Sequence, residues 1–288
     1  MTVRGALMRV LLQEDVNFLL TNRLPRRFAT NLVGRFSRIE QPLVSKASIR
    51  VWRIFSDLDL SDAATTRFRS MHDCFTRRLK PGARTIDARP EILASPCDAI
   101  VGAIGRVLGD EVHQIKGMPY SLAELLGDAA DAVPFTGGTF ITLRLTAAMY
   151  HHFHAPADLT VERVRYLSGD CWNVNPIALR RVERLFCRNE RAVVNCRMHD
   201  GGAPFLLVAV AAILVAGIRL TFLDTDRLLR EGGDRTVPLS ADMAKGEEMG
   251  WFEHGSTIVM FLPEGFAPAD GISEGSPIRQ GEALARRL

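Results

Sequence analysis

Hydrophobic residues near the start of the chain recur at helical spacing. Four of them fall on one face of a helix: Phe28, Leu32, Phe36 and Ile39. Residues 43–55 continue this amphipathic pattern. Residues 60–80 predict a further helix with Asp62 close to its start, and the Lys-Pro-Gly sequence at 80–82 ends it.

From residue 92 onward the pattern changes to short β-branched runs separated by glycine, which is typical of strands joined by tight turns. The predicted strands cover residues 92–107, 111–116, 140–153, 161–167, 192–198, 205–222 and 257–262. A small helix interrupts them around Leu122–Leu126. This order predicts an α+β protein, with N-terminal amphipathic helices followed by a β-rich body of barrel or sandwich type.

The longest uncharged run, residues 201–218, just reaches the length of a membrane span. It contains Pro204 and many Val, Ala and Ile residues, so buried strands are the favoured interpretation. A hydrophobic fraction of 47% and a charged fraction of 24% indicate a globular core and exclude a disordered or collagen-like chain. No signal peptide is expected at the start of the sequence, and five cysteines without a CxxC pair favour a reducing compartment.

Charge is unevenly distributed along the chain. The first 53 residues hold ten Lys/Arg against three acidic residues, a net charge of +7, so the other residues carry −4. Such a basic segment predicts an anionic partner. Arg27 and Arg38 flank the apolar stripe, as in a helix that lies at a membrane surface, whereas no nucleic-acid-binding motif accompanies the charge. The alternative is that these helices pack on the body with their arginines in solvent.

Three places hold candidate catalytic groups. Residues 150–156 contain three of the seven histidines, and strand alternation puts His152 and His154 on one face and His151 on the other. Histidine near neutrality suits acid–base chemistry, and no ligand spacing favours a metal. A Gly-Ser-Thr sequence around Ser256 opens an apolar strand, and Asp98 follows a proline turn. The alternatives are a surface histidine cluster and two ordinary turns.

Several blocks of the chain, in order, resemble motifs of the phosphatidylserine decarboxylase proenzyme family. They are FTRRLKPGAR at 75–84, SPCD at 95–98, IKG and YSL within 115–122, YHHFHAP at 150–156, VNP at 174–176, NER at 189–191, KGEEMGWF at 245–252 and GST at 255–257. Three positions depart from the family pattern: Ala99 replaces a glycine, His152 replaces an arginine, and His254 precedes Gly255 where Leu, Gly or Phe is typical.

The resemblance implies autocatalytic cleavage between Gly255 and Ser256, with Asp98, His154 and Ser256 as the charge relay. Ser256 would become a pyruvoyl group and the Schiff-base site, without a metal or pyridoxal phosphate. The products would be a β chain of residues 1–255 and an α chain of residues 256–288. The mature enzyme would convert phosphatidylserine to phosphatidylethanolamine and CO2, with His151 meeting the substrate carboxylate.

In this interpretation residues 1–60 are a basic, membrane-associating helical region and residues 61–288 the catalytic decarboxylase domain. The expected partner is phosphatidylserine in an anionic membrane, at the cytoplasmic face of a bacterial inner membrane. A homodimer is left open, and nucleic acid is not an expected partner. Two alternatives stand beside it: a pyruvoyl-dependent decarboxylase of a soluble amino acid, and a processing-dead lipid-binding paralogue, which the presence of Asp98, His154 and Ser256 disfavours.

Overall fold

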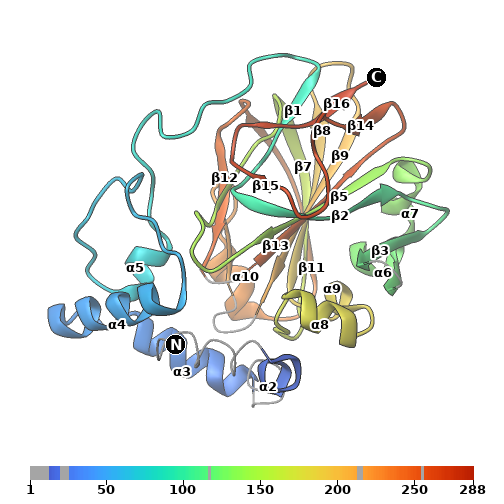
Figure 1. The fold of residues 1–288 in the computed structure, drawn as a ribbon. Helices are drawn as coiled ribbons and strands as arrows, with labels where there is room; N and C mark the ends of the chain where they lie inside the picture. Colours follow the sequence, from blue (N-terminus) through green and yellow to red (C-terminus); the bar gives the residue numbers. More distant parts are fainter. Residues whose placement is uncertain (1–12, 20–25, 116–117, 213–216, 254–255) are drawn as a thin grey trace.

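The computed structural model describes residues 13–19, 26–115, 118–212, 217–253 and 256–288, with only the backbone at 16–17, 26–31 and 229. Its centre is an open, antiparallel eight-stranded sheet (Figure 1). In spatial order the strands are β11 (Arg235–Met243), β7 (Leu159–Leu167), β8 (Arg191–Met198), β9 (Pro204–Ala211), β13 (Ser256–Leu262), β5 (Thr139–Leu145), β2 (Ala99–Arg106) and β15 (Pro277–Ile278). Because β11 and β15 are edge strands, the body is of the sandwich type and the barrel alternative is wrong.

Side chains of β13 alternate between two hydrophobic cores, one on each face of the sheet. Ile258 and Met260 join the first core, and Val259 and Phe261 join the second. Two three-stranded sheets cover the first core: β1 (Ile92–Ala94), β16 (Ala283–Arg287) and β14 (Phe266–Pro268), and β10 (Ile218–Leu220), β12 (Glu248–Phe252) and β6 (His152–His154). Ser256 therefore begins a strand that is buried on both faces.

A hairpin and short helices cover the second core (Figure 1). They are β3 (Glu111–Ile115), β4 (Met118–Ser121), α6 (Leu122–Leu126), α7 (Ala129–Ala132), η2 (Val133–Phe135), α8 (Pro176–Arg181) and α9 (Leu185–Arg188). Ser121 caps α6 by accepting a hydrogen bond from the backbone of Glu124, and Gly127 ends it with a positive φ of 71°. The sequence prediction of this helix is confirmed.

The N-terminal helices lie to one side of the sheet layers (Figure 1). They are α2 (Glu14–Phe18), α3 (Arg26–Ser37), α4 (Pro42–Phe55) and α5 (Met71–Phe75). One further helix, α10 (Thr225–Glu231), lies later in the chain and precedes β11. Gln41 caps α4, and Pro42 occupies the first helical position, where its missing N–H costs no hydrogen bond. The predicted amphipathic helices are thus present.

The predicted helix over residues 60–80 is wrong for most of its length. Only Met71–Phe75 is helical, and its cap is Ser70 rather than Asp62. Before Ser70, side chains capture the backbone N–H groups that a helix would use: Ser61 N donates to Asp59, and Arg67 N donates to Thr65 Oγ1. Residues 60–70 therefore form turns.

The strand predictions are largely confirmed, with three long runs divided. The run 92–107 separates into β1 and β2, 140–153 ends at Leu145 and resumes as β6, and 205–222 separates into β9 and β10. The uncharged run 201–218 thus contains a central strand, as favoured above. No helix in the described part of the chain is long and apolar enough to cross a membrane. Sequence reasoning missed β11, although Val237, Leu239, Ala241 and Met243 alternate with exposed residues, as expected of a half-exposed edge strand.

Candidate active site

Ser256 is fully buried at the start of β13. Its backbone pairs with Leu145 of β5 on one side and Ala211 of β9 on the other. Among the described residues, no atom forms a hydrogen bond with its Oγ. A buried hydroxyl without a partner costs free energy, so it is a feature to expect at a reactive group. His254 and Gly255, on the other side of the predicted cleavage site, lie outside the described residues.

His154 is held in one tautomer by its neighbours. Its Nδ1 lies 3.0 Å from the carbonyl oxygen of Gly246, which can only accept, so Nδ1 carries the proton. Its Nε2 lies 3.1 Å from the hydroxyl of Tyr150. Burial lowers the pKa of His154 and raises the pKa of Tyr150, so the imidazole is neutral and the phenol donates to it. His154 therefore presents a basic Nε2.

Asp98 is held by an arginine and not by His154. Arg84 donates two hydrogen bonds to its carboxylate, of 2.9 and 2.5 Å, and the backbone N–H of Gln280 donates a third. The charge relay implied by the family resemblance would have Asp98 hold the His154 imidazole, but no hydrogen bond joins these two described residues. The backbone brings them near each other, since His154 N donates to Pro96 O at 2.8 Å. Asp98 can therefore act on His154 through its charge.

His151 is fully buried on the side of the helical region. Its Nδ1 lies 2.9 Å from Met149 O, and its ring centroid lies 3.9 Å from that of Phe75. Its carbonyl accepts a hydrogen bond from Phe252 N, four residues before Ser256. His151 is thus tied to the end of the strand that leads toward Ser256.

His152, which replaces the family's arginine, is a packing residue between two aromatic rings. It stacks on Tyr150 with centroids 4.9 Å apart and on Trp251 at 5.6 Å. Its Nδ1 lies 3.2 Å from the carboxylate of Glu248. Because His154 contacts the same Tyr150 ring, the prediction that His152 and His154 share a face is confirmed.

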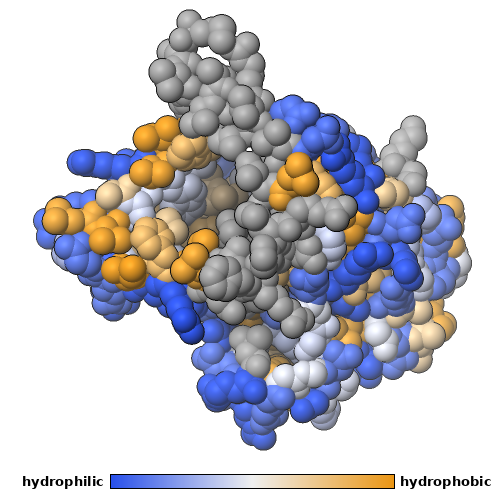
Figure 2. Space-filling model, turned by 90° about the horizontal axis from the view of Figure 1, so that it is seen from below, coloured by the Kyte–Doolittle hydropathy of each residue, from blue (hydrophilic) through white to orange (hydrophobic). Residues whose placement is uncertain are grey.

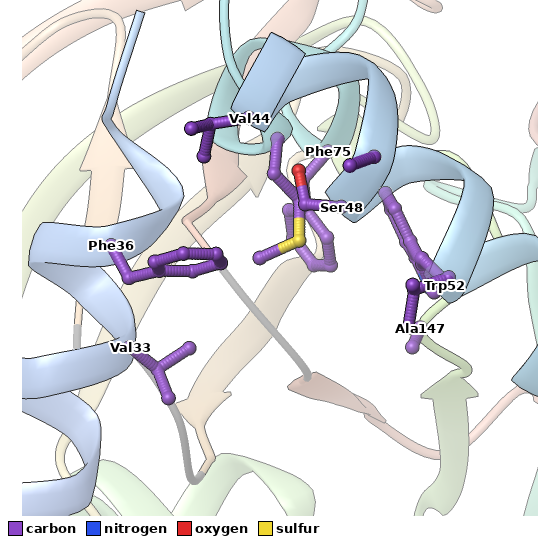
Figure 3. A pocket seen from close by; sticks show the side chains of 10 residues that line it. Val33, Phe36, Val44, Ser48, Trp52, Phe75 and Ala147 are labelled. Atoms are coloured by element: carbon purple, nitrogen blue, oxygen red, sulfur yellow. The ribbon is translucent and has the colours of Figure 1, made fainter. Parts of the chain in front are cut away.

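An apolar groove of about 620 Å³ opens between the N-terminal helices. Figure 3 shows side chains from α3, α4 and α5 and the loop after β5 converging on it. Its lining residues are Val33, Phe36, Val44, Ala47, Ser48, Val51, Trp52, Met71, Phe75 and Ala147. Phe75 is both a wall of this groove and the residue against His151, so the groove leads toward the candidate site.

The exposed face of the helical region is strongly apolar. The side chains of Leu32, Phe36 and Ile39 are 57%, 46% and 41% exposed. Exposed residues of α4 extend this surface: Leu43, Val51, Ile54 and Phe55. Figure 2 shows hydrophobic side chains gathered on the side of the molecule that carries α4. The side chains of Arg27 and Phe28 lie outside the described part, and the membrane role of the stripe stays a prediction.

Arg38 points to the body of the protein. Its Nη2 lies 2.8 Å from Oε2 of Glu253, so the guanidinium of Arg38 forms an ion pair with the body instead of lying unpaired beside the apolar stripe. Sequence reasoning also missed the roles of Arg84 and Tyr150 beside Asp98 and His154. Both belong to motif blocks described above, so their positions could have been found from the motifs, whereas Glu253 gave no such signal.

Comparison with known proteins places these residues in a family. The model of the phosphatidylserine decarboxylase family matches residues 71–286. This chain belongs to the phosphatidylserine decarboxylase family. A phosphatidylserine decarboxylase proenzyme of Xanthomonas campestris pv. campestris (strain 8004) is 36% identical over 282 residues, covering 93% of this chain and 97% of the relative. One of Shewanella sp. (strain W3-18-1) is 33% identical over 284 residues, covering 94% and 98%.

The family is one of carboxy-lyases, and its relatives are named proenzymes, in keeping with the resemblance found in the motif blocks. The match at 71–286 covers all four residues to which the decarboxylase resemblance gave chemical roles, Asp98, His151, His154 and Ser256. Within the described residues, no group of three or more His, Cys, Asp or Glu side chains is arranged to hold a metal ion.

Proposed function

We propose that this chain is a self-processing decarboxylase that converts phosphatidylserine to phosphatidylethanolamine and CO2. The observation that carries the proposal is Ser256: a fully buried hydroxyl without a hydrogen-bond partner among the described residues, at the first position of the central strand. The family match supports the substrate, since the relatives are named for phosphatidylserine.

Maturation would begin at Ser256. Its Oγ attacks the carbonyl carbon of Gly255, the peptide C–N bond breaks, and an ester replaces the amide. Removal of the Cα proton of residue 256 then breaks the Cβ–O bond. This elimination releases the carboxylate of Gly255 and leaves dehydroalanine, whose imine tautomer takes up water and loses ammonia. The strand partners of β13 would keep the resulting α chain of residues 256–288 bound to the β chain.

His154 would accept the proton at Nε2, because the imidazole is neutral and its own proton is on Nδ1. The Tyr150 hydroxyl and the Gly246 carbonyl fix the ring, and the charge of Asp98 favours the imidazolium that forms. Arg84 holds Asp98 in place with two hydrogen bonds. His151 would act in turnover; its backbone carbonyl accepts a hydrogen bond from Phe252, four residues before Ser256, which supports this assignment.

The residues around Ser256 fit a pyruvoyl group. A small group at the start of β13, enclosed by β5 and β9, would replace a side chain that forms no hydrogen bond in the described structure. A pyruvoyl carbonyl supplies the electron sink that decarboxylation of an amine-bearing substrate requires.

The helical region would hold the enzyme at the membrane. The exposed apolar side chains of α3 and α4 are suited to the lipid interface, and the net charge of +7 over the first 53 residues favours an anionic surface. The apolar lining of the groove between these helices would suit an acyl chain of the substrate, with its headgroup directed toward His151. We place the enzyme at the cytoplasmic face of the inner membrane.

Mass spectrometry of the purified protein tests the proposal. The wild-type chain should give two fragments divided between Gly255 and Ser256, and the Ser256→Ala variant should give one intact chain. Vesicles containing phosphatidylserine should release CO2 with the wild type only. An intact wild-type chain that decarboxylates the lipid would overturn the self-processing part, and CO2 from free serine but not from the vesicles would favour a soluble amino acid as substrate.

A further inference from the structure

Glu253 is a buried carboxylate three residues before Ser256. It is only 7% exposed, and two arginines from distant parts of the chain bind it. Arg38, directly after α3, reaches Oε2 at 2.8 Å, and Arg219 of β10 donates to Oε1 through Nε and Nη2 at 3.2 Å each. His72 of α5 lies 4.0 Å from Oε1. We call Glu253 with Arg38 and Arg219 the Glu253 clamp.

The backbone around Glu253 makes room for this arrangement. Glu253 N donates to the carbonyl of Gly217 at 3.0 Å. A Cβ atom on Gly217 would lie 2.6 Å from Oε2 of Glu253, closer than such atoms approach, so any larger residue would displace the carboxylate. Asp226 binds the remaining side of Arg219, so this arginine is itself fixed. The carboxylate is therefore held from several sides at once.

We propose that the Glu253 clamp positions the scissile peptide for self-cleavage and joins the helical region to that step; this rests on the proposed function. Glu253 and Ser256 are the described residues on either side of the cleavage site. Ser256 is fixed between β5 and β9, and Glu253 is fixed by the two arginines. Glu253 is a positioning residue and takes no proton in the reaction.

Fixing both ends of a short peptide limits the conformations that it can adopt. Attack by a hydroxyl on a neighbouring carbonyl depends strongly on such orientation, and displacement by about 1 Å can cost roughly a hundredfold in rate. Because Arg38 follows α3, docking of this helix would complete the clamp. Cleavage is then efficient only when the membrane-binding helix has reached its place on the body.

The test follows conversion of newly synthesised full-length precursor into two chains over time. Glu253→Gln keeps the shape of the side chain but removes its charge, and we expect cleavage to slow by at least about tenfold. Gly217→Ala, which displaces the carboxylate without altering it, should slow cleavage as well. Arg38→Ala should slow it, with partial recovery in Arg38→Lys, because lysine restores the charge without the planar donor group.

Arg35→Ala is the matched control. Arg35 is an exposed arginine in the last turn of α3, three residues before Arg38, so this variant removes the same charge and should cleave at the wild-type rate. Hydroxylamine provides a second measurement, because it splits an ester but not a peptide. If the clamp aligns the attack, uncleaved Glu253→Gln precursor contains little ester and stays intact with hydroxylamine.

Two results would overturn the positioning role while the wild type still cleaves normally. One is a wild-type cleavage rate in both Glu253→Gln and Arg38→Ala. The other is loss of folding, measured by thermal unfolding of these variants in the Ser256→Ala background, which would make the clamp merely structural. Failure of the wild type itself to cleave would instead reject the proposed function.

Discussion

The ring of Phe75 lies against the imidazole of His151, with centroids 3.9 Å apart and planes inclined by 33°. Phe75 also lines the apolar groove and stacks on Trp52 at 5.8 Å. One side chain therefore separates the surface proposed for lipid from a histidine proposed for turnover. A substitution in the groove can therefore affect the proposed decarboxylation by moving the Phe75 ring against His151.

Replacing Phe75 by leucine should lower decarboxylation more than self-cleavage. Leucine keeps most of the apolar contact but removes the flat face against His151. Truncation to alanine should also destabilise the fold, by about 3–5 kcal/mol, as is typical for a buried phenylalanine. Turnover of phosphatidylserine in mixed micelles and urea unfolding measure the two effects. Equal loss of cleavage and turnover in Phe75→Leu would contradict this separation.

His154→Ala should stall self-cleavage, and His151→Ala should still produce two chains but decarboxylate poorly. A positioned acid or base contributes about 10²–10⁴-fold in rate, which sets the expected loss in each case. Gel analysis of the chains and CO2 release from phosphatidylserine vesicles measure the two steps separately. Normal maturation of His154→Ala together with a block in His151→Ala would exchange the two roles.

Self-cleavage should be insensitive to pH from about 8 down to 6.5 and should slow at lower pH. Burial lowers the pKa of His154 below its ordinary value of 6.5, and the base is active only when neutral, so most of the imidazole stays active at pH 6.5 and the midpoint of its protonation lies lower. The rate constant of precursor conversion across buffers gives the profile. A rate that falls already above pH 7 would mean that the active base is not this buried histidine.

Tyr150→Phe should shift this profile upward. The Tyr150 hydroxyl donates to Nε2 and stabilises neutral His154, so its loss raises the pKa of the imidazole. The phenylalanine ring retains the stack on His152, which makes the variant a local change. We expect cleavage on the acidic side of the profile to slow by about fivefold, since such a hydrogen bond contributes about 1 kcal/mol. An unchanged midpoint would contradict the role of this hydroxyl.

Arg84→Ala should destabilise the fold and slow cleavage. It leaves Asp98 without the two charge-assisted hydrogen bonds that hold it, and breaking a buried pair costs about 3–5 kcal/mol. Arg84→Lys should restore part of the stability, because a lysine supplies the charge but one fewer aligned donor. Urea unfolding in the Ser256→Ala background separates stability from cleavage. Wild-type stability in Arg84→Ala would contradict the importance of the pair.

Replacing Leu32 and Ile39 by serine should release the protein from anionic vesicles while leaving the fold intact. Both side chains are largely exposed, so the body loses little packing, whereas each apolar side chain that enters the interface contributes about 1.5–3 kcal/mol. Vesicle sedimentation at low and high salt measures binding, which salt should also weaken. Retained binding by the double variant would place the membrane contact on another surface.

Sequence reasoning reached the features that local pattern and motif order can carry. The strand beginning at Ser256, the helix Leu122–Leu126 and the apolar stripe through Phe36 follow from periodicity, because side-chain spacing reports the local backbone. The ordered motif blocks indicated the family. The helix predicted over 60–80 failed because side chains such as Asp59 captured backbone donors, a competition that periodicity does not register.

Only the tertiary structure decided which side chains face one another. Asp98 binds Arg84, His154 is held by Tyr150 and Gly246, and Arg38 crosses 215 residues of sequence to reach Glu253. These pairings depend on strand register, on the turn after each strand and on where α3 meets the body. None of these is determined by the residues adjacent in sequence, since each is the outcome of packing the whole chain around its two cores.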